Sequence, residues 1–339
     1  MPHFSLLMPT FGHSAIIEET LNTIKSQDFQ DYEVIIIPDG EAELYADIQK
    51  RWVVDKRYKF FMQYDNVGYC GNLKRCLAHA MGKFVIYFAS DDLMGPGMLS
   101  YYNEVYKKYN VSAILRTYYW YEHDYQTAVR AKRVLEADTV ILDITSSDPR
   151  EIQIAFETVD QLTGLSFQRT SLTVLNNQHV FPCHAYPLFD SILMSGKFAY
   201  VSKDFVAVRI GASQCITISK IYRDSPIMTW TLALEKFNAP NNYGDLKSYL
   251  KKNWIGSNFL GFLQIRTFSE RPLPYLVREI YYLLKLNPLA VFNPVFLGVV
   301  GLCFIFPSMV LLKITTFVKN KMLRYVQPNL SSRKIGDLI

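Results

Sequence analysis

Short apolar runs alternate with helix-like stretches through the first 90 residues of this 339-residue chain. The apolar runs are FSLLMP at residues 4–9, YEVIIIP at 32–38, YKFFMQY at 58–64 and FVIYF at 84–88. Between them, stretches such as AIIEETLNTIK have apolar residues at helical spacing. This alternation predicts an α/β fold with a mostly parallel sheet flanked by helices.

Polar residues follow the predicted strands, at the edge of such a sheet where ligands bind. They are Thr10 after the first strand, Asp39 after the second, Asn66 and Asn72 after the third, and Asp91 and Asp92 after the fourth. Adjacent carboxylates at a buried strand end cost desolvation energy unless a cation or hydrogen-bond donors receive them. A hard divalent ion such as Mg²⁺ or Mn²⁺, shared with a substrate diphosphate, would do so. A solvated turn or a helix N-cap is the alternative.

Four segments resemble, in order and spacing, the inverting family-two glycosyltransferases with the GT-A fold. They are LLMPTFG, IIIPDGE, NVGYCGNLKRCLAHAMGKFVIYFASDDL and PLFDSILMSGKFAYVSKDFVAVRI, within residues 1–213. The resemblance implies that Asp39 holds the nucleobase of a nucleotide-sugar donor, and that Asp91 and Asp92 hold its ribose and metal-bound diphosphate. Ala89 stands where the family often has a further Asp, which leaves open whether Asp91 or Asp92 ligates the metal directly; Asp91 is favoured.

In such a reaction an acceptor hydroxyl attacks the anomeric carbon of the sugar, and a nucleoside diphosphate leaves. Mn²⁺ or Mg²⁺ neutralises charge on the leaving group, and a base takes the hydroxyl proton. The resemblance implies that Asp190 in YPLFDSIL is this base, because the family places an Asp shortly before a segment like GKFAYV. A helix N-cap or a partner for a nearby lysine is the alternative role. Asp204 and Asp224 are competing candidates in segments with a surface-like pattern.

Further site residues come from weaker parts of the resemblance. Arg209 in VAVRIG matches an arginine that the family places near the donor diphosphate, whereas Gly211 stands where many members have a histidine. The stretch QLTGLSFQRTSL at residues 161–172 resembles the one that lines the acceptor side. Within it, Arg169 either pairs with an acceptor phosphate or caps a surface helix. His184 either touches the acceptor or is structural.

The C-terminal part of the chain has the composition of a membrane-associating segment. Residues 287–312 contain no charged residue, and ~20 apolar residues suffice to cross a bilayer. The 27 residues after them carry a net charge of +5, which equals that of the whole chain. This asymmetry favours attraction to anionic lipid and not to nucleic acid. A buried helix of a soluble subdomain is the alternative, and Pro307 interrupts any simple span.

The sequence therefore predicts three parts. They are a GT-A domain at residues 1–215, a helical extension with an interfacial helix at 216–286, and a membrane-associating apolar segment with a basic tail at 287–339. No secretory signal is evident at the N-terminus, and nucleotide sugars are cytosolic. We therefore expect a peripheral or re-entrant protein at the cytoplasmic face of the membrane, acting on a lipid-linked or oligosaccharide acceptor with UDP as the expected donor nucleotide.

Three functions are compatible with these patterns. The favoured one is a non-processive inverting glycosyltransferase of cell-surface polysaccharide assembly. A processive synthase would carry Gln-x-x-Arg-Trp after the base, but the nearest match, QKRW at residues 49–52, is one residue short and precedes the acidic motif. A catalytically silent GT-A homologue that binds nucleotide or glycan as a partner subunit is the alternative, because family residues are missing at positions 89 and 211.

Overall fold

The computed structural model describes residues 1–12, 14–121, 129–130, 134–169, 181–209, 219–237 and 244–314. The chain divides into two compact units between Gly211 and Ala212. The first predicted boundary, at residue 215, falls outside the described residues, and the division at residue 286 stays a prediction. Each unit is described by itself below.

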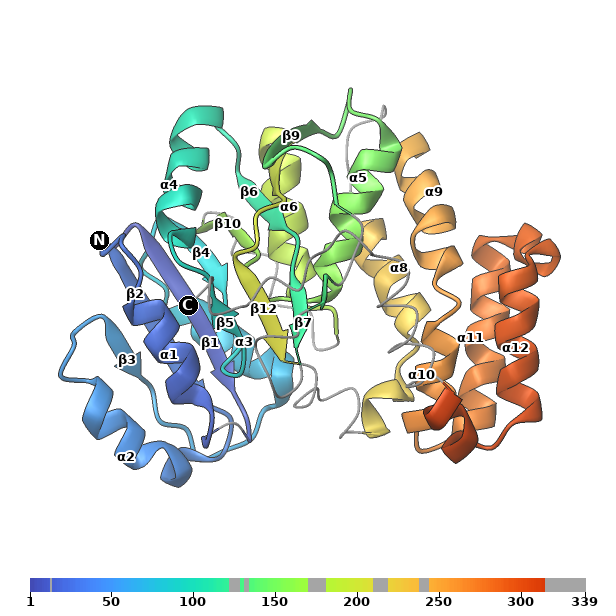
Figure 1. The fold of residues 1–339 in the computed structure, drawn as a ribbon, viewed down its shortest axis with the longest axis horizontal. Coiled ribbons are helices and arrows are strands. Elements are labelled where there is room, and N and C mark those ends of the chain that lie inside the picture. Colours follow the sequence, from blue (N-terminus) through green and yellow to red (C-terminus); the bar gives the residue numbers. More distant parts are fainter. Residues whose placement is uncertain are drawn as a thin grey trace. The chain divides into compact units, whose positions relative to one another are not determined.

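The first unit is built on an eight-stranded sheet with the order β3-β2-β1-β4-β10-β6-β11-β9 (Figure 1). Its strands are β1 (Phe4–Thr10), β2 (Tyr32–Pro38), β3 (Tyr58–Phe60), β4 (Phe84–Tyr87), β6 (Ala113–Arg116), β9 (Thr139–Asp143), β10 (Ser166–Gln168) and β11 (Lys197–Val201). Strands β9 and β10 run against the others, which are parallel to one another. This confirms the mostly parallel sheet predicted from the sequence.

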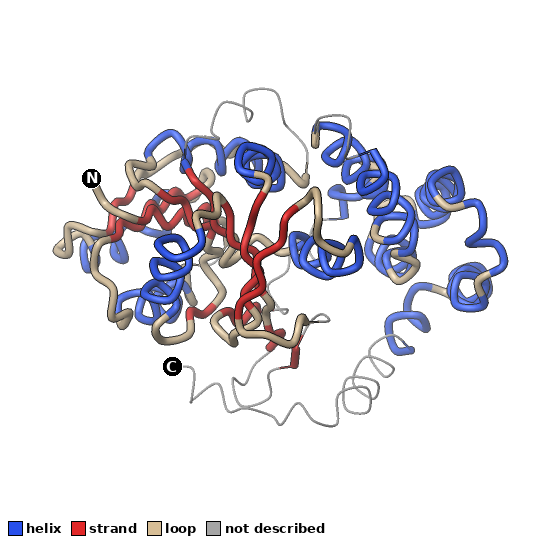
Figure 2. The backbone as a smooth tube through the Cα atoms, turned by 90° about the horizontal axis from the view of Figure 1, so that it is seen from above, coloured by secondary structure: helices blue, strands red, loops and turns tan. Residues whose placement is uncertain are grey.

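Helices cover both faces of this sheet, as Figure 2 shows. They are α1 (Ile17–Lys25), α2 (Ala42–Trp52), α3 (Gly68–His79), α4 (Met98–Tyr109), α5 (Pro149–Phe156), the short 3-10 helix η2 (Glu157–Asp160) and α6 (Ala185–Ser195). Helix α1 buries Ile17, Leu21 and Ile24, which have helical spacing, in the same core as β1 and β2. Each such fully buried side chain stabilises the fold by roughly 2 kcal/mol.

A smaller four-stranded sheet has the order β5-β12-β7-β8. Its strands are β5 (Leu93–Met94), β7 (Tyr119–Tyr121), β8 (Val129–Arg130) and β12 (Val206–Arg209). Strand β5 begins directly after Asp92, and its Leu93 pairs with Ala207 of β12. This pairing brings Arg209, at the end of β12, to the acidic pair that follows β4.

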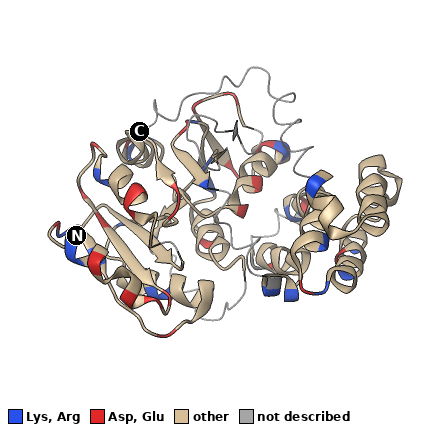
Figure 3. Cartoon of the chain, turned by 60° about the horizontal axis from the view of Figure 1, so that its bottom comes forward, with Lys and Arg blue, Asp and Glu red and all other residues tan. Residues whose placement is uncertain are grey.

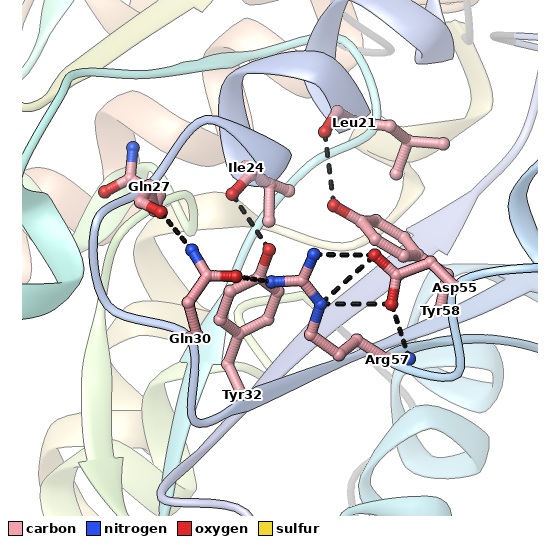
Figure 4. A network of polar contacts seen from close by, with 8 residues as sticks. All are labelled: Leu21, Ile24, Gln27, Gln30, Tyr32, Asp55, Arg57 and Tyr58. Atoms are coloured by element: carbon pink, nitrogen blue, oxygen red, sulfur yellow. Dashed lines mark hydrogen bonds and ion pairs between the residues drawn. The ribbon is translucent and has the colours of Figure 1, made fainter.

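A polar network at the amino ends of β2 and β3 fastens α1 to the sheet (Figure 4). The guanidinium of Arg57 donates to the Asp55 carboxylate, with Nε 3.0 Å from Oδ1 and Nη2 2.6 Å from Oδ2. It also lies over the Tyr32 ring, 4.7 Å from its centroid, and the Tyr32 hydroxyl donates to the Ile24 carbonyl at 3.1 Å. These contacts occupy the edge of the sheet opposite to the one where the predicted site lies.

The second unit is helical. Its elements are η4 (Ser219–Arg223), α8 (Pro226–Lys236), α9 (Gly244–Asn253), η6 (Ile255–Ser257), α10 (Gly261–Phe268), α11 (Pro272–Leu286), η7 (Pro288–Phe292) and α12 (Pro294–Ile305). The buried carboxylate of Glu279 accepts from the Ser225 hydroxyl at 2.8 Å and from the Ile227 N–H at 3.2 Å, which ties α11 to the start of α8. Arg266 of α10 donates to the carbonyls of Cys303 (2.9 Å) and Phe306 (3.3 Å) at the end of α12.

Charged residues occur in both units (Figure 3), but α12 contains none. Within the described residues, no helix combines the length and the apolar character needed to cross a bilayer.

Candidate active site

The carboxyl ends of β1 and β2 hold the first two predicted residues. The Asp39 N–H donates to the Thr10 carbonyl at 2.9 Å. The Thr10 hydroxyl is buried and lies 2.5 Å from the Tyr45 hydroxyl, and it accepts from Ser90 at 2.9 Å. Thr10 therefore links α2 to the segment that follows β4.

Asp39 is buried against the turn that precedes α3. Its Oδ1 accepts from the Val67 N–H at 2.8 Å. Burial raises the pKa of Asp39, and the N–H groups of Val67 and Gly68 act against this rise. Gly40 has a φ of +81°, and a Cβ there would lie 2.9 Å from the backbone nitrogen of Asn66. The glycine thus allows Asp39 and Asn66 to lie side by side, as predicted from the strand ends.

Asn72 of α3 is 2% exposed and donates through Nδ2 to the Ile37 carbonyl at 2.7 Å. Its Oδ1 is buried and has no hydrogen-bond partner among the described residues. An unsatisfied buried acceptor costs free energy, so such atoms in native proteins usually await a ligand or water. The position of Asn72 beside β2 is consistent with its predicted role in donor binding.

Asp92 is almost wholly buried, and both of its carboxylate oxygens accept hydrogen bonds from the protein. Oδ1 accepts from the Arg209 N–H at 2.9 Å, and Oδ2 accepts from the Thr163 hydroxyl. That hydroxyl also accepts from the Ala89 N–H at 3.1 Å. Burial raises the pKa of the Asp92 carboxyl well above its usual range, and the neighbouring Asp91 acts in the same direction.

The backbone of Asp91 is held from the smaller sheet. Its carbonyl accepts from the Tyr121 hydroxyl at 3.0 Å and from Arg209 Nε at 3.2 Å. The Arg209 guanidinium lies over the Tyr121 ring, 4.8 Å from its centroid, and also donates to Glu19 at 2.5 Å. Arg209 thus lies against the acidic pair, where the resemblance expects it.

The acidic pair is the candidate site for a divalent metal. Among the described residues no group of three or more His, Cys, Asp or Glu side chains is arranged to hold an ion. Mg²⁺, however, commonly takes one or two carboxylates, several waters and substrate phosphates. Each oxygen of Asp92 already accepts one hydrogen bond from the protein, and Asp91 stays the predicted direct ligand of a metal shared with a diphosphate. A direct metal bond from Asp92, also predicted, would use a second lone pair of an oxygen that already accepts a hydrogen bond.

Arg169 does not join this group. It follows β10, which runs against β4, so it lies at the amino end of β4. There its Nε donates to the Gly82 carbonyl at 2.8 Å, and its N–H donates to the Lys83 carbonyl at 3.1 Å. The predicted contact with the acceptor is therefore not supported by its position.

Asp190 also lies apart from the carboxylates. The next residue, Ser191, donates to the carbonyl of Ser112, which directly precedes β6, at 2.8 Å. Helix α6 therefore runs from the carboxyl edge of the sheet toward the amino edge, and Asp190 lies more than one turn along it. Its position supports neither the predicted base nor the alternative of a helix N-cap.

Of the two competing candidates for the catalytic base, one is buried, contrary to the sequence pattern, and the other lies outside the unit that contains the site. Asp204 is buried, not at the surface, and accepts from the Tyr119 hydroxyl at 2.5 Å. Asp224 is exposed and belongs to the second unit. Gly211 lies outside the described residues.

His184 lies at the start of α6, and the protein uses both of its ring nitrogens. Nε2 is 2.7 Å from the Val159 carbonyl, and Nδ1 is 3.0 Å from the Tyr69 hydroxyl. Because a carbonyl only accepts, Nε2 carries the proton and Nδ1 accepts from Tyr69. Burial lowers the pKa of His184 to about 4. This environment favours the structural role over direct contact with an acceptor.

Three residues of the site were not predicted. Thr163 reaches Asp92, Tyr69 reaches His184, and Arg116 lies buried at the end of β6. A charged residue at the end of an apolar strand, as in AILR, is a signal that could have found Arg116. The other two are ordinary loop and helix residues, and only the fold brings them to their partners.

Solved structures share the fold of this chain. TarS of S. aureus, in complex with UDP-GlcNAc, has a TM-score of 0.61, with 15% identity over 85% of this chain and 82% of that chain. The mannosyltransferase PcManGT of Pyrobaculum calidifontis, in complex with GDP-Man and Mn²⁺, has a TM-score of 0.54, with 14% identity over 97% of this chain and 88% of that chain. At such identities the likeness concerns the fold, and it confirms the predicted GT-A class.

The family follows from the sequence comparison. Residues 5–172 match the model of glycosyl transferase family 2, and this part of the chain is a family-two glycosyltransferase domain. A Campylobacter jejuni relative named GalNAc(5)-diNAcBac-PP-undecaprenol beta-1,3-glucosyltransferase is 32% identical over 30% of this chain. The putative glycosyltransferase EpsH of Bacillus subtilis is 29% identical over 28% of this chain. The matches span 33% and 28% of these two relatives.

Proposed function

We propose that this protein is an inverting glycosyltransferase that moves a sugar from a nucleotide-diphosphate donor to a hydroxyl of a lipid-linked glycan. The observation that carries the proposal is the group of polar residues at the carboxyl edge of a family-two domain, formed by Asp39 after β2, Asn72 of α3 and Asp91 after β4. The undecaprenol-linked substrate named for the C. jejuni relative supports a lipid-linked acceptor in cell-surface polysaccharide assembly. The UDP-GlcNAc in the TarS structure supports UDP as the donor nucleotide.

Each residue then has a distinct task toward the donor. The Asp39 carboxylate accepts a hydrogen bond from an N–H group of the nucleobase. The buried Asn72 Oδ1 accepts a hydrogen bond from another N–H or O–H group of the nucleoside. Asp91 would hold Mn²⁺ or Mg²⁺, and a bound metal would supply Lewis-acid stabilisation of the leaving diphosphate. Arg209, held against Asp91, adds positive charge on the same side.

For the base we propose Asp160 in place of Asp190. The acceptor oxygen forms a bond to the anomeric carbon while the bond to the diphosphate oxygen breaks, and a carboxylate takes the hydroxyl proton. Asp160 is exposed at the end of η2 and accepts from the Tyr118 hydroxyl at 2.9 Å. The neighbouring Val159 carbonyl is bonded to His184, at the carboxyl edge of the sheet. A carboxylate on the acceptor side of this edge is what the reaction requires.

We further propose that the second unit attaches to the membrane surface in the plane of the bilayer. Helix α11 exposes Leu273, Val277 and Tyr281, which are four residues apart and form one apolar line. Lys285 and Arg271, also exposed, lie near its two ends. This pattern of apolar residues with flanking cations is typical of interfacial helices.

The segment after α11 supports the same attachment. Phe292, Ile305 and Met309 are 79%, 73% and 77% exposed, although large apolar side chains in water are costly. The basic tail after Leu312 would add attraction to anionic lipid. Such an anchor would hold the enzyme at the cytoplasmic face of the membrane, close to a lipid-linked acceptor.

Nucleotide binding tests the central proposal. We expect UDP, in a panel with dTDP and GDP, to raise the melting temperature of the full chain in the presence of Mn²⁺. Excess chelator or Asp91→Ala should remove this rise. Asp47→Ala, which alters an exposed carboxylate paired with Lys50 on α2, is the matched control and should behave as wild type.

A transfer assay with labelled nucleotide sugars separates the enzyme from a silent homologue. Mn²⁺-dependent turnover onto a polyprenyl-diphosphate-linked glycan would support the proposal. Nucleotide binding without transfer or hydrolysis of any donor would support the silent homologue. If no nucleoside diphosphate binds with or without metal, the proposed donor site is wrong.

A further inference from the structure

The guanidinium of Arg116 is buried close to the acidic pair. Arg116, the last residue of β6, is 0% exposed. Its Nε donates to the Thr163 carbonyl at 2.5 Å, its Nη1 to Thr158 at 3.0 Å and its Nη2 to Gln161 at 2.7 Å. All three acceptors belong to the segment 158–163, which we call the clamped segment. One side chain thus fixes three carbonyls within six residues of chain.

The choice of arginine at this position has a physical reason. Burying a cation is costly unless its hydrogen-bond donors are satisfied. A guanidinium has five N–H donors in a rigid planar fork, so it can hold several carbonyls at once, whereas an ammonium is a compact point charge. The Arg116 guanidinium also lies over the Tyr118 ring, 5.0 Å from its centroid. The site therefore needs both the charge and the shape of arginine.

The clamped segment carries the group that orients Asp92. The Thr163 hydroxyl donates to Asp92 Oδ2, while the Thr163 carbonyl accepts from Arg116. The next residue, Gly164, donates from its N–H to the Tyr87 carbonyl at 2.7 Å. Arg116 thus acts on Asp92 through a single intervening residue.

We propose that Arg116 is a positioning residue for donor binding. By holding the clamped segment, it keeps the Thr163 hydroxyl on Asp92, so that Asp91 is the carboxylate of the pair that takes the metal-bound diphosphate. This inference rests on the proposed function, because it concerns the same donor site. Side chains that orient ligand residues from outside the first layer typically change metal affinity by roughly 10- to 100-fold.

Two substitutions test the inference separately and together. Arg116→Lys keeps the charge, but the three donors of an ammonium share one nitrogen and cannot reach carbonyls placed around three nitrogens of a guanidinium. Thr163→Val keeps the shape and removes the hydroxyl. We expect each to weaken Mn²⁺-dependent UDP binding about 10-fold by calorimetry. Because Arg116 acts through Thr163, the double variant should bind no more weakly than the weaker single variant.

The chain offers a matched control. Arg266 of the second unit is also partly buried and donates to two backbone carbonyls, at Cys303 and Phe306. Arg266→Lys should lower the melting temperature and leave the dissociation constant for UDP with Mn²⁺ unchanged. Binding of UDP without metal should be unchanged in Thr163→Val, because the lost hydroxyl contacts Ala89 and Asp92 and neither Asp39 nor Asn72.

The possible outcomes are distinguishable. If Arg116→Lys lowers only the melting temperature, as in Arg266→Lys, Arg116 is structural and the inference is wrong. Additive losses in the double variant would also overturn it. Should Arg116→Lys fail to fold, Thr163→Val decides alone, and wild-type metal-dependent binding in that variant contradicts the inference. If the wild-type chain binds no nucleoside diphosphate of the panel, the proposed function itself has failed.

Discussion

The adjacent residues Asp91 and Asp92 at the carboxyl edge of the sheet have different hydrogen-bonding environments, which suits them to different roles. Asp91 and Asp92 are adjacent, yet Asp92 spends both oxygens on Thr163 and the Arg209 N–H. Two like charges so close together also disfavour double ionisation. The pair therefore divides into a carboxylate that organises the protein and one that is suited to the ligand.

The base can be located by comparing two carboxylates. We expect Asp160→Asn to lower the transfer rate by about 10² to 10⁴, because an amide cannot accept the proton, with donor binding nearly intact. Asp190→Asn is the matched variant near the amino edge and should stay within a few-fold of wild type. The opposite result in steady-state kinetics would restore Asp190 as the base.

The buried His184 makes stability depend on pH. Its pKa is lowered to about 4 in the folded state, against 6.5 in the unfolded chain. The unfolded state therefore binds more protons between these values, so stability is present above pH 6.5 and is lost as the pH falls toward 4. Between pH 6.5 and 5 this amounts to about 2 kcal/mol.

Urea unfolding at several pH values measures this effect. His184→Asn retains an acceptor for Tyr69 but has no group that titrates in this range, so the acid-side loss should become shallower. If the free energy of unfolding of this variant falls with decreasing pH as steeply as that of wild type, other histidines or carboxylates produce the loss.

At the scale of elements, local sequence patterns predicted where the strands lie better than they predicted whether a residue lies at the carboxyl or the amino edge of the sheet. Thr10 and Asp39 lie where predicted, because β1 and β2 follow local apolar runs and are parallel. Arg169 was misplaced because β10 runs antiparallel, which moves the following residue to the opposite edge. No local pattern reports strand direction, since direction depends on pairing with distant strands.

The direction of α6 shows the same limit. The sequence predicts a carboxylate before GKFAYV, and Asp190 is indeed there, but the Ser191 bond to Ser112 turns that part of the helix to the amino edge. This bond joins residues 79 apart in the chain. Arg116 was missed for a related reason, because its three acceptors become neighbours only after the clamped segment has folded.

The apolar line on α11 can be tested by charge. Val277→Glu combined with Phe292→Glu should weaken binding to vesicles containing phosphatidylglycerol at least about tenfold, because each acidic group must otherwise enter the apolar interface. Leu44→Glu, at a 59% exposed position on α2, is the control. Co-sedimentation of all three proteins gives the comparison, and equal binding would exclude α11 and η7 as the attachment surface.

At the scale of the whole molecule, the residues of the proposed nucleotide site lie within the first unit, whereas the exposed apolar residues after Leu286 belong to the second. We expect deletion of residues 288–339 to weaken binding to anionic vesicles, although the apolar line of α11 remains in that variant. Mn²⁺-dependent UDP binding should persist, and transfer to a short soluble acceptor should largely survive. Transfer to a lipid-linked acceptor should fall, because enzyme and substrate no longer share a surface.

Vesicle binding at high salt is a second test of the same attachment. Screening removes the electrostatic part and leaves the apolar part, so flotation should weaken only partly in the full-length chain. If the full-length chain does not bind vesicles at low salt, the apolar segment is not a membrane anchor. Loss of UDP binding in the deletion variant would mean that the first unit depends on the second for its fold.

The hydrogen bond from the Arg209 N–H to Asp92 has a consequence for biosynthesis. It closes the acidic pair with a residue 117 positions later in the chain, and beyond the region that matches the family, which ends at residue 172. Contacts of such long sequence separation form late, because loop closure must precede them. We expect ribosome-bound chains stopped at residue 172 to retain no UDP, a point that filter binding can check. A growing polypeptide would then acquire its substrate site only when β12 has left the ribosome, so that unfinished chains do not sequester nucleotide sugars.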